Sequence, residues 1–347
     1  MSDRYGIVYM GSKEKILDLI DYLFEREYKK KTFIDLFAGG FAVSGFALNK
    51  TKFNVISNDL NRYVIGLYVE ILSGSENLDQ VKYDWVSRLQ FELVRDHPES
   101  FPDWYVGYVL NVWSFGCNQK DYLYAKDLED NKKAIHQAIV FNDFRLMNEN
   151  PLFKGFKVSD TIKHINFKEH PLKRLAFMEK FKNFIKENQD NERYEELRRM
   201  EQLESLSQML HLNAIERNIR FTDRLSLHAK DWKELYEEIP EEILEEAFIY
   251  CDPPYENTKQ YLFGSDFNYE DFWQWFRECP YSVYVSSYTA PDDIEPINFT
   301  HKQVNLDNGN RSDERITTKK KAIENIYWNG KGNAEPTMLD LLFDKGV

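Results

Sequence analysis

The sequence contains little cysteine and no pattern typical of a disulfide framework or a zinc site. Its three cysteines, Cys117, Cys251 and Cys279, are spread over a chain of 347 residues, and no two of them form a CxxC pair. The seven histidines are not spaced from them in the way that zinc ligands are. We therefore expect a reduced, cytoplasmic protein that holds no metal.

Long apolar runs and an excess of basic charge are also missing. No run approaches the ~20 apolar residues that span a bilayer, and residues 1–5 lack the charged-then-apolar layout of a secretion signal. Lys and Arg number 45 against 58 Asp and Glu, a net charge of −13, so basic charge does not coat the protein. A net negative charge is still compatible with a local basic groove, because binding depends on a patch of the surface and not on the total charge. Hydrophobic residues (42%) and aromatic residues (15%) exclude global disorder and collagen.

Two parts of the chain have an α/β pattern. In residues 5–72, apolar runs predict strands at 32–37 and 53–57, helices at 42–48 and 62–72, and an earlier helix around 16–24 that Ser12 caps. After Asn218 the pattern returns, with strands expected at 225–228, 247–251 and 282–288. Strands that alternate with helices are typical of a parallel sheet.

The residues between these parts have a helical pattern and many aromatic side chains. From about Pro171 to Arg217 the chain is charge-dense, and one helical face is expected to carry Leu197, Met200, Leu203, Leu206 and Leu210. The segment is too long for a loop. We therefore predict an α/β fold with a doubly wound, mostly parallel, Rossmann-like sheet formed by residues 1–74 and 216–347. A mainly helical domain, residues 75–215, is inserted into it.

A glycine turn follows the first predicted strand. The run from Phe33 to Gly40 includes Asp35 in the buried strand expected at 32–37 and then places Ala38, Gly39 and Gly40 before a helix. Glycines in this position let a ligand approach the backbone and the helix N-terminus. Asp59 ends the next strand, where a carboxylate can accept hydrogen bonds from a ribose diol. The pattern is shared by many nucleotide-binding α/β proteins.

The sequence motif Asp252-Pro253-Pro254-Tyr255 follows the apolar strand at 247–251. The two prolines remove two N–H donors and stiffen the turn. The Asp252 carboxylate and a nearby carbonyl then face outward as acceptors, and Tyr255 supplies a flat face for stacking. Two acceptors and a stacking face suit a planar exocyclic amino group, such as that of a nucleobase.

These motifs, in this order, resemble those of the Dam-like, alpha-group adenine-N6 DNA methyltransferases. The resemblance is carried by Tyr9-Met10-Gly11-Ser12-Lys13, the glycine turn, a long insertion, Asp252 to Tyr255, and the stretches 113–118 and 283–291. The middle helical arm resembles leucine- and glutamate-rich segments of phage-type members. Where the family often has a third glycine, this chain has Phe41.

The resemblance implies a Rossmann-like methyltransferase sheet that binds S-adenosylmethionine (SAM), with the insert recognising the DNA target. It implies that Asp35 engages the amino group of the cofactor, that Asp59 holds its ribose, and that Asp231 and Trp232 meet its adenine. It implies that Asp252 and the Pro253 carbonyl accept from the amino group of a flipped adenine. The residues that the resemblance assigns to the cofactor are Tyr9, Lys13, Asp35, Phe37, Ala38, Gly39, Gly40, Asp59, Asp231, Trp232 and Asp252, and those assigned to catalysis are Asp252, Pro253, Pro254 and Tyr255.

Contacts to double-stranded DNA are expected from the insert, where basic and aromatic residues are interleaved. Asn118, Lys120, Tyr122 and Lys126 are the candidates, because Asn and Lys reach base edges and Lys neutralises phosphate. A basic stretch with Arg311, Arg315 and Lys319 to Lys321 is a second candidate for backbone contacts. The resemblance also implies a nucleoid-associated location during action on DNA and, in a restriction–modification system, a cognate restriction endonuclease.

Other functions stay open at this point. Cytosine N4 carries an amino group that needs the same two acceptors, although Asp at position 252 favours adenine. RNA is a less favoured substrate, because no RNA-binding module is recognisable. A regulator that binds SAM and DNA without turnover would not need an intact Asp252–Tyr255 motif, so the presence of the motif argues against this alternative. A nucleotide-dependent enzyme would need a phosphate-binding GxxxxGK[ST] motif, which the sequence lacks.

Overall fold

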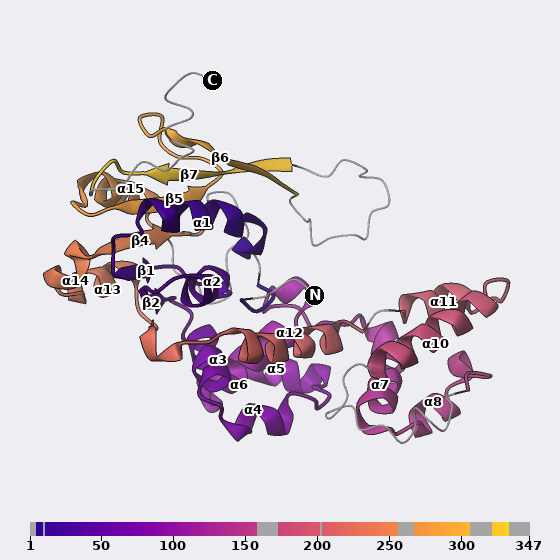
Figure 1. Cartoon of the computed structure of the whole chain (residues 1–347). Coiled ribbons are helices and arrows are strands. Elements are labelled where there is room, and N and C mark those ends of the chain that lie inside the picture. Colours follow the sequence, from indigo (N-terminus) through magenta and orange to yellow (C-terminus); the bar gives the residue numbers. More distant parts are fainter. Residues whose placement is uncertain are drawn as a thin grey trace.

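The computed structural model describes residues 5–9, 11–157, 173–201, 203–255, 267–305 and 321–332. It contains a sheet with helices on both faces and a helical part beside it (Figure 1). The side chains of the basic stretch from Arg311 to Lys321 lie outside the described residues. None of the described helices combines the length and the apolar composition needed to cross a bilayer.

The sheet has seven strands in the order β3-β2-β1-β4-β5-β7-β6. Its first five strands in this order run parallel, and β7 is antiparallel to both β5 and β6. The central strand β1 pairs Ile34 with Ile56 of β2 and with Ile249 of β4. The strands are β1 (Thr32–Asp35), β2 (Asn54–Asn58), β3 (Leu225–His228), β4 (Ala247–Cys251), β5 (Val283–Ser287), β6 (Pro296–Asn305) and β7 (Lys321–Trp328). The prediction of a mostly parallel α/β sheet is confirmed.

Alternate residues of each strand build two cores, one on each face of the sheet. On β4, Phe248 and Tyr250 pack into one core, while Ile249 and Cys251 pack into the other. Residues of the two cores alternate along the strand because successive side chains of a strand point to opposite faces of the sheet. The first face is covered by α1 (Leu17–Arg26), α2 (Ala42–Lys50) and α3 (Arg62–Leu72), and the second by α13 (Trp232–Glu238), α14 (Glu241–Glu245) and α15 (Tyr269–Glu278).

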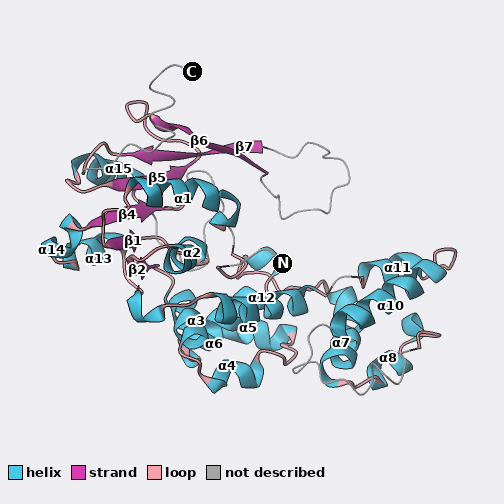
Figure 2. Ribbon diagram, in the orientation of Figure 1, coloured by secondary structure: helices cyan, strands magenta, loops and turns pink. Residues whose placement is uncertain are grey.

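Between β2 and β3 the described residues form helices and no strand (Figure 2). In Figure 1, α4, α5, α6 and α12 lie around α3, and α7, α8, α10 and α11 form a lobe to one side. These helices are α4 (Glu76–Val81), α5 (Arg88–Asp96), α6 (Asp103–Val112), α7 (Lys126–Phe141), α8 (Arg145–Glu149), α10 (Lys173–Glu187), α11 (Tyr194–Arg199) and α12 (Glu204–Asn218). The short 3₁₀ turns are η1 (Lys13–Ile16), η2 (Pro98–Ser100), η3 (Phe115–Cys117), η4 (Pro151–Phe153) and η5 (Thr222–Arg224).

The helical part joins the sheet through a close crossing of α3 and α6. A Cβ atom on Gly107 would lie 2.1 Å from the Tyr63 carbonyl oxygen, so only glycine permits this approach. The buried residues of the helical part and of the first sheet face form one continuous core. The described residues between 75 and 215 therefore share a core with the first face of the sheet, and their role as a separate recognition domain stays a prediction.

Two local expectations differ from the structure. The helical face expected to carry Leu197, Met200, Leu203, Leu206 and Leu210 is not continuous, because α11 ends at Arg199 and α12 begins at Glu204. The described residues from Lys173 to Asn218 form three helices, α10, α11 and α12. A turn in which the Asn191 amide donates to the Asn188 carbonyl separates α10 from α11, as Asn and Asp favour. Ser12 does not cap the first helix, since the turn η1 comes between and the Ser12 side chain makes no cap hydrogen bond.

Candidate active site

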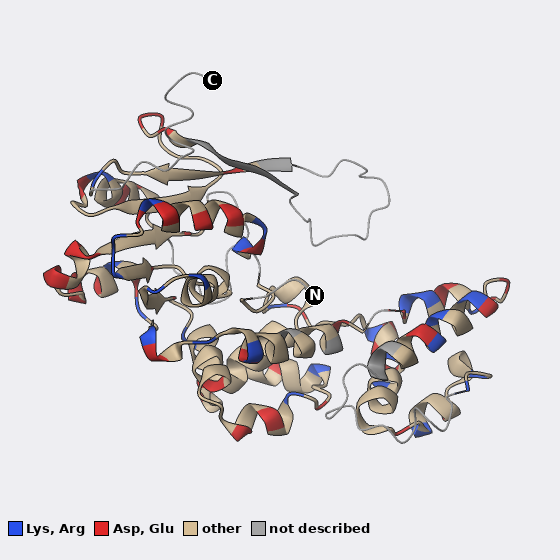
Figure 3. Cartoon of the chain, viewed as in Figure 1, with Lys and Arg blue, Asp and Glu red and all other residues tan. Residues whose placement is uncertain are grey.

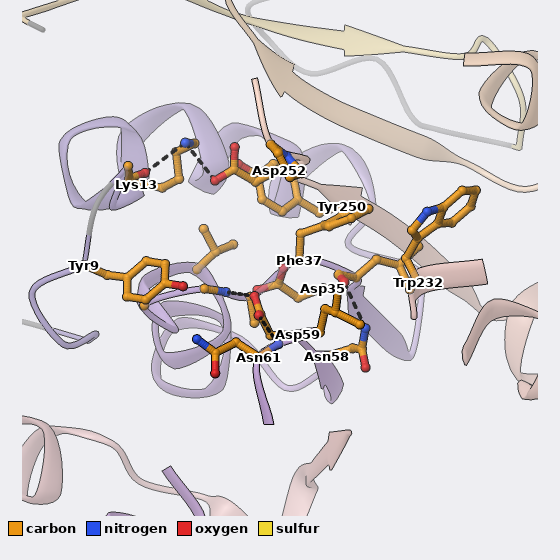
Figure 4. Close-up of a pocket in the computed structure, with 18 of the residues that line it drawn as sticks. Tyr9, Lys13, Asp35, Phe37, Asn58, Asp59, Asn61, Trp232, Tyr250 and Asp252 are labelled. Carbon is orange, nitrogen blue, oxygen red and sulfur yellow. Dashed lines mark hydrogen bonds and ion pairs between the residues drawn. The ribbon is translucent and has the colours of Figure 1, made fainter. Parts of the chain in front are cut away.

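A pocket lies at the carboxyl ends of β1, β2 and β4, the edge where open parallel sheets bind ligands. Figure 4 shows side chains from these strand ends, from the N-terminal segment and from the start of α13 around it. Of the predicted site residues, the pocket is lined by Tyr9, Lys13, Asp35, Phe37, Ala38, Gly39, Gly40, Asp59, Asp231, Trp232, Asp252 and Pro254. The fold thus brings together residues that are more than 200 positions apart in the sequence.

Asp35 is a buried carboxylate at the end of β1. Only 1% of its surface is exposed, and Ser44 of α2 donates a hydrogen bond of 2.7 Å to its Oδ2. Its Oδ1 has no hydrogen-bond partner among the described residues. Burial raises the pKa of Asp35 to about 7, and the neighbouring charges of Asp252 and Asp59 act in the same direction. An unpartnered buried acceptor in a pocket is suited to a cationic donor of a ligand.

The glycine turn between β1 and α2 is tightly packed against the N-terminal segment. A Cβ on Gly40 would lie 2.6 Å from Cβ of Tyr9, so the turn needs glycine there whether or not a ligand is bound. Phe41, at the family's third glycine position, has a left-handed backbone with φ of 65°. Its fully buried ring stacks on Tyr68, with 4.4 Å between the centroids. Packing therefore offsets a backbone conformation that costs about 1 kcal/mol.

Asp59 and Asn58 hold the loops around the pocket. Asp59 accepts from the amides of Gly39 and Asn61, both at 2.8 Å. Burial raises the pKa of Asp59, and these two hydrogen bonds oppose the shift. Asn58 donates to the carbonyl oxygens of Leu36 and Lys230, which ties the ends of β1 and β3 to β2.

Aromatic side chains form one wall of the pocket. Trp232 begins α13 and lies 6.3 Å from the ring of Phe37, measured between centroids. Asp231 caps the same helix, because its Oδ1 accepts from the amide of Lys233 at 2.9 Å. The wall offers an apolar face beside a carboxylate, a combination that suits a purine with an amino group.

At the other end of the pocket, the donors around Asp252 include Lys13, Ser286 and Tyr255. The Lys13 ammonium lies 2.7 Å from Oδ2 of Asp252, and the Ser286 hydroxyl donates to Oδ1 at 3.1 Å. Burial raises the pKa of Asp252 to about 6, against the opposing attraction of Lys13. Burial opposes the charge of Lys13, but attraction to Asp252 and Glu324 outweighs it and raises the pKa of Lys13.

Tyr255 is held by a residue that the sequence did not single out. Its hydroxyl donates to Oε1 of Glu324, a buried residue of β7. Its ring packs edge-on against Tyr288, with centroids 4.5 Å apart, and Lys13 Nζ lies 4.9 Å from its centroid. Pro253, which follows Asp252 in the chain, is buried.

Comparison with known families supplies the identity. The family model described as D12 class N6 adenine-specific DNA methyltransferase matches residues 9–206 of the chain, which is more than half of it. The chain belongs to this family. The match includes the glycine turn and much of the helical part but ends before Asp252. Among curated proteins, none matches the chain.

The chain is therefore an adenine-specific DNA methyltransferase, and the predicted resemblance is confirmed at the level of the family. The roles of the individual pocket residues stay predictions. No group of three or more His, Cys, Asp or Glu among the described residues is arranged to hold a metal ion.

The predicted DNA contacts of this methyltransferase are not among the residues that line the pocket, but their stretch touches it, because pocket-lining Asn61 donates to Oε1 of Gln119 at 3.2 Å. Lys120 and Lys126 are exposed, and Asn118 is partly exposed but uses its Oδ1 to accept from the amides of Lys120 and Asp121. Tyr122 is only 6% exposed, and its hydroxyl donates to the Val86 carbonyl at 2.6 Å. This burial in the core does not fit the DNA contact expected for Tyr122. The contacts of the other residues stay predictions.

Tyr68 of α3 is a further residue that supports the site and was missed. Its hydroxyl accepts from the amide of Ile7 at 2.8 Å and donates to the carbonyl of Gly40 at 2.5 Å. It therefore clamps the N-terminal segment onto the glycine turn. Tyr68 looks in the sequence like an ordinary apolar helix position, and Ser44 like an ordinary small residue of a helix.

The substitution Tyr68→Phe is expected to lower the free energy of unfolding by about 2–4 kcal/mol, because two buried backbone groups lose their partner. The ring and its stacking on Phe41 are kept. Denaturant unfolding of both proteins measures the loss. Tyr28→Phe, at an exposed position, is the control. Equal stability of Tyr68→Phe and the native chain would contradict the clamp.

Proposed function

We propose that the chain transfers a methyl group from SAM to N6 of an adenine that is flipped out of double-stranded DNA. The observation that carries the proposal is the position of Asp252 at the carboxyl end of β4, in one pocket with Asp35 and Asp59. The pocket provides acceptors for a cofactor at one end and for an amino group at the other. Membership of an adenine-specific family supports the choice of base.

The pocket residues fit the chemistry of SAM. Asp35 has an unpartnered buried oxygen for the amino group of the cofactor, and Asp59 would accept from its ribose hydroxyls. Phe37 and Trp232 would pack against its adenine, with Asp231 as an acceptor beside them. When bound, SAM supplies an electrophilic methyl group on a sulfonium centre.

Asp252 would act on the target amino group. The lone pair of this nitrogen is delocalised into the adenine ring, which makes it a poor nucleophile. Accepting one N–H at Asp252 and the other at the Pro253 carbonyl favours a pyramidal nitrogen with a localised lone pair. As the nitrogen gains positive charge, Asp252 stabilises that charge and takes the proton that is lost. Tyr255 would stack on the base and orient it.

The helical part is where duplex DNA would bind. A base within a duplex cannot reach a pocket of this kind, so the target must be flipped out. Figure 3 shows Lys and Arg among the acidic residues of α10 and α11, whereas acidic residues dominate on α13 and α14. Phosphate binding therefore favours the helical side over the α13–α14 side.

The proposal is tested by incubating the protein with unmethylated duplex DNA and SAM that carries a labelled methyl group. The DNA is then digested to nucleosides, which are separated. Label in N6-methyladenine nucleoside is expected. Label in N4-methylcytosine nucleoside would show that the target base is cytosine. SAM binding without transfer of label to DNA would favour an RNA substrate or a non-catalytic regulator.

Transfer is also expected to depend on pH through Asp252. Because burial raises its pKa to about 6, the carboxylate is ionised at pH 8 and protonated below pH 6. A protonated carboxyl cannot accept the proton, so kcat at saturating SAM and DNA should fall about tenfold per pH unit below that value. A constant kcat between pH 8 and pH 5 would contradict this role of Asp252.

A further inference from the structure

Lys13 occupies the position that the proposed function assigns to the target amino group. Its ammonium meets Oδ2 of Asp252 at 2.7 Å and lies 4.9 Å from the centroid of the Tyr255 ring. These are the two contacts expected of the substrate: an N–H directed to Asp252 and a place over Tyr255. Figure 4 shows the Lys13 side chain directed at the Asp252 carboxylate.

The two donors therefore compete. Oδ1 of Asp252 already accepts from Ser286, which leaves the oxygen held by Lys13 for an amino group. A charged ammonium is a stronger donor than an aromatic amine, so the base enters only if Lys13 has another buried anionic partner nearby. Only 9% of the Lys13 side chain is exposed, so its ammonium cannot readily turn into solvent when the base enters.

Glu324 meets that requirement. Its Oε1 lies 3.5 Å from Lys13 Nζ, and only 4% of its side chain is exposed. Lys13 also donates to the Gly11 carbonyl at 2.9 Å, so a small shift between the two carboxylates keeps this bond. The group of Lys13, Asp252 and Glu324, in which Asp252 is partly exposed and the other two are buried, contains one cation and two anions, and either anion can pair with the cation.

We propose that Glu324 is a positioning residue for methyl transfer, which receives the Lys13 ammonium when the target amino group takes its place on Asp252. The proposal rests on the proposed function. Without Glu324, Lys13 stays paired with Asp252 and excludes the base. Glu324 also orients Tyr255, because it accepts a hydrogen bond from the Tyr255 hydroxyl.

A double-mutant cycle separates this role from a structural one. Glu324→Gln keeps an acceptor for Tyr255 but removes the anion, and at saturating SAM it is expected to lower kcat/KM for DNA roughly 10–100-fold. Lys13→Met removes the competing donor. In the Lys13→Met background, Glu324→Gln should change kcat/KM by less than about threefold. Glu278→Gln, at an exposed position on α15, is the matched control and should have no effect.

Two outcomes of the cycle would overturn the proposal. If Glu324→Gln causes the same loss in both backgrounds, Glu324 acts only through Tyr255 or the fold. If Glu324→Gln alone leaves kcat/KM unchanged, Lys13 needs no second partner. Thermal unfolding of each variant shows whether a loss comes from unfolding.

A second measurement does not depend on activity. Lys13 in the DNA-free protein is reductively methylated with formaldehyde and cyanoborohydride, and its labelling rate is read by mass spectrometry. Lys13 should stay protected in Asp252→Asn and in Glu324→Gln and become labelled in the double variant. If Asp252→Asn is labelled as fast as the double variant, Glu324 does not hold the ammonium and the proposal is wrong. If the native chain transfers no methyl group but the labelling is as expected, the proposed function fails, while the pairing of Lys13 with Glu324 stands.

Discussion

Replacing Asp252 by asparagine is expected to lower kcat for methyl transfer about 1,000-fold while changing SAM affinity by less than about tenfold. The amide has nearly the same size, so packing is kept. It has lost the charge that stabilises the developing cation, cannot take the proton, and presents an N–H donor where an acceptor is needed. Among single substitutions, this one is expected to have the largest effect on rate.

The measurement is single-turnover transfer of labelled methyl groups to duplex DNA at saturating SAM. Asp292→Asn, at an exposed position outside the pocket lining, is the matched control and should retain full activity. If Asp252→Asn retains more than a tenth of the native rate, the acceptor of the target proton is not Asp252. Calorimetric binding of SAM to the same variant shows whether the cofactor end of the pocket is intact.

Replacing Asp35 by asparagine is expected to stabilise the cofactor-free protein at pH 8. Burial raises the pKa of Asp35 from 3.8 to about 7, so the folded chain keeps a proton that the unfolded chain loses. The native protein therefore loses stability as the pH rises through this interval, and above pH 7 it carries the full cost of a buried charge. Removing that charge should raise the free energy of unfolding by roughly 2–4 kcal/mol at pH 8 and by little at pH 4.

The same substitution should weaken SAM binding by about 10–100-fold, because a charge-assisted contact to the amino group of the cofactor is lost. Denaturant unfolding at pH 4, 6 and 8 and calorimetric SAM binding measure the two effects. Asp223→Asn, at an exposed position, is the control for both. A variant that is stabilised at pH 8 but binds SAM as well as the native chain would leave Asp35 without a cofactor role.

Local patterns predicted the elements that carry the chemistry. The runs at 32–37 and 247–251 contain β1 and β4, and burial of every residue of both strands explains why the runs are mostly apolar, with Asp35 as the charged exception. The glycine turn and the Asp252–Tyr255 motif lie at the ends of these strands, as expected. The prediction of one helical face from Leu197 to Leu210 was wrong, because a helical period does not reveal where one helix ends and the next begins.

Long-range partners could not be predicted. Tyr68, Ser44 and Glu324 look like ordinary positions in a helix or a strand, and their importance depends on what they face. Tyr122 shows the reverse case, since a tyrosine between lysines has the pattern of a DNA contact but lies in the core.

The sequence by itself determined the class of sheet, the family motifs and the carboxylates at the strand ends, because these depend on residues that are neighbours in the chain. Only the tertiary structure decided that Lys13, Asp252, Tyr255 and Glu324 form one cluster. The physical reason is the sheet order: β7 pairs antiparallel with β5, next to β4, and so places Glu324 against Lys13 of the N-terminal segment and against Tyr255, which follows β4. No periodicity or spacing encodes that juxtaposition.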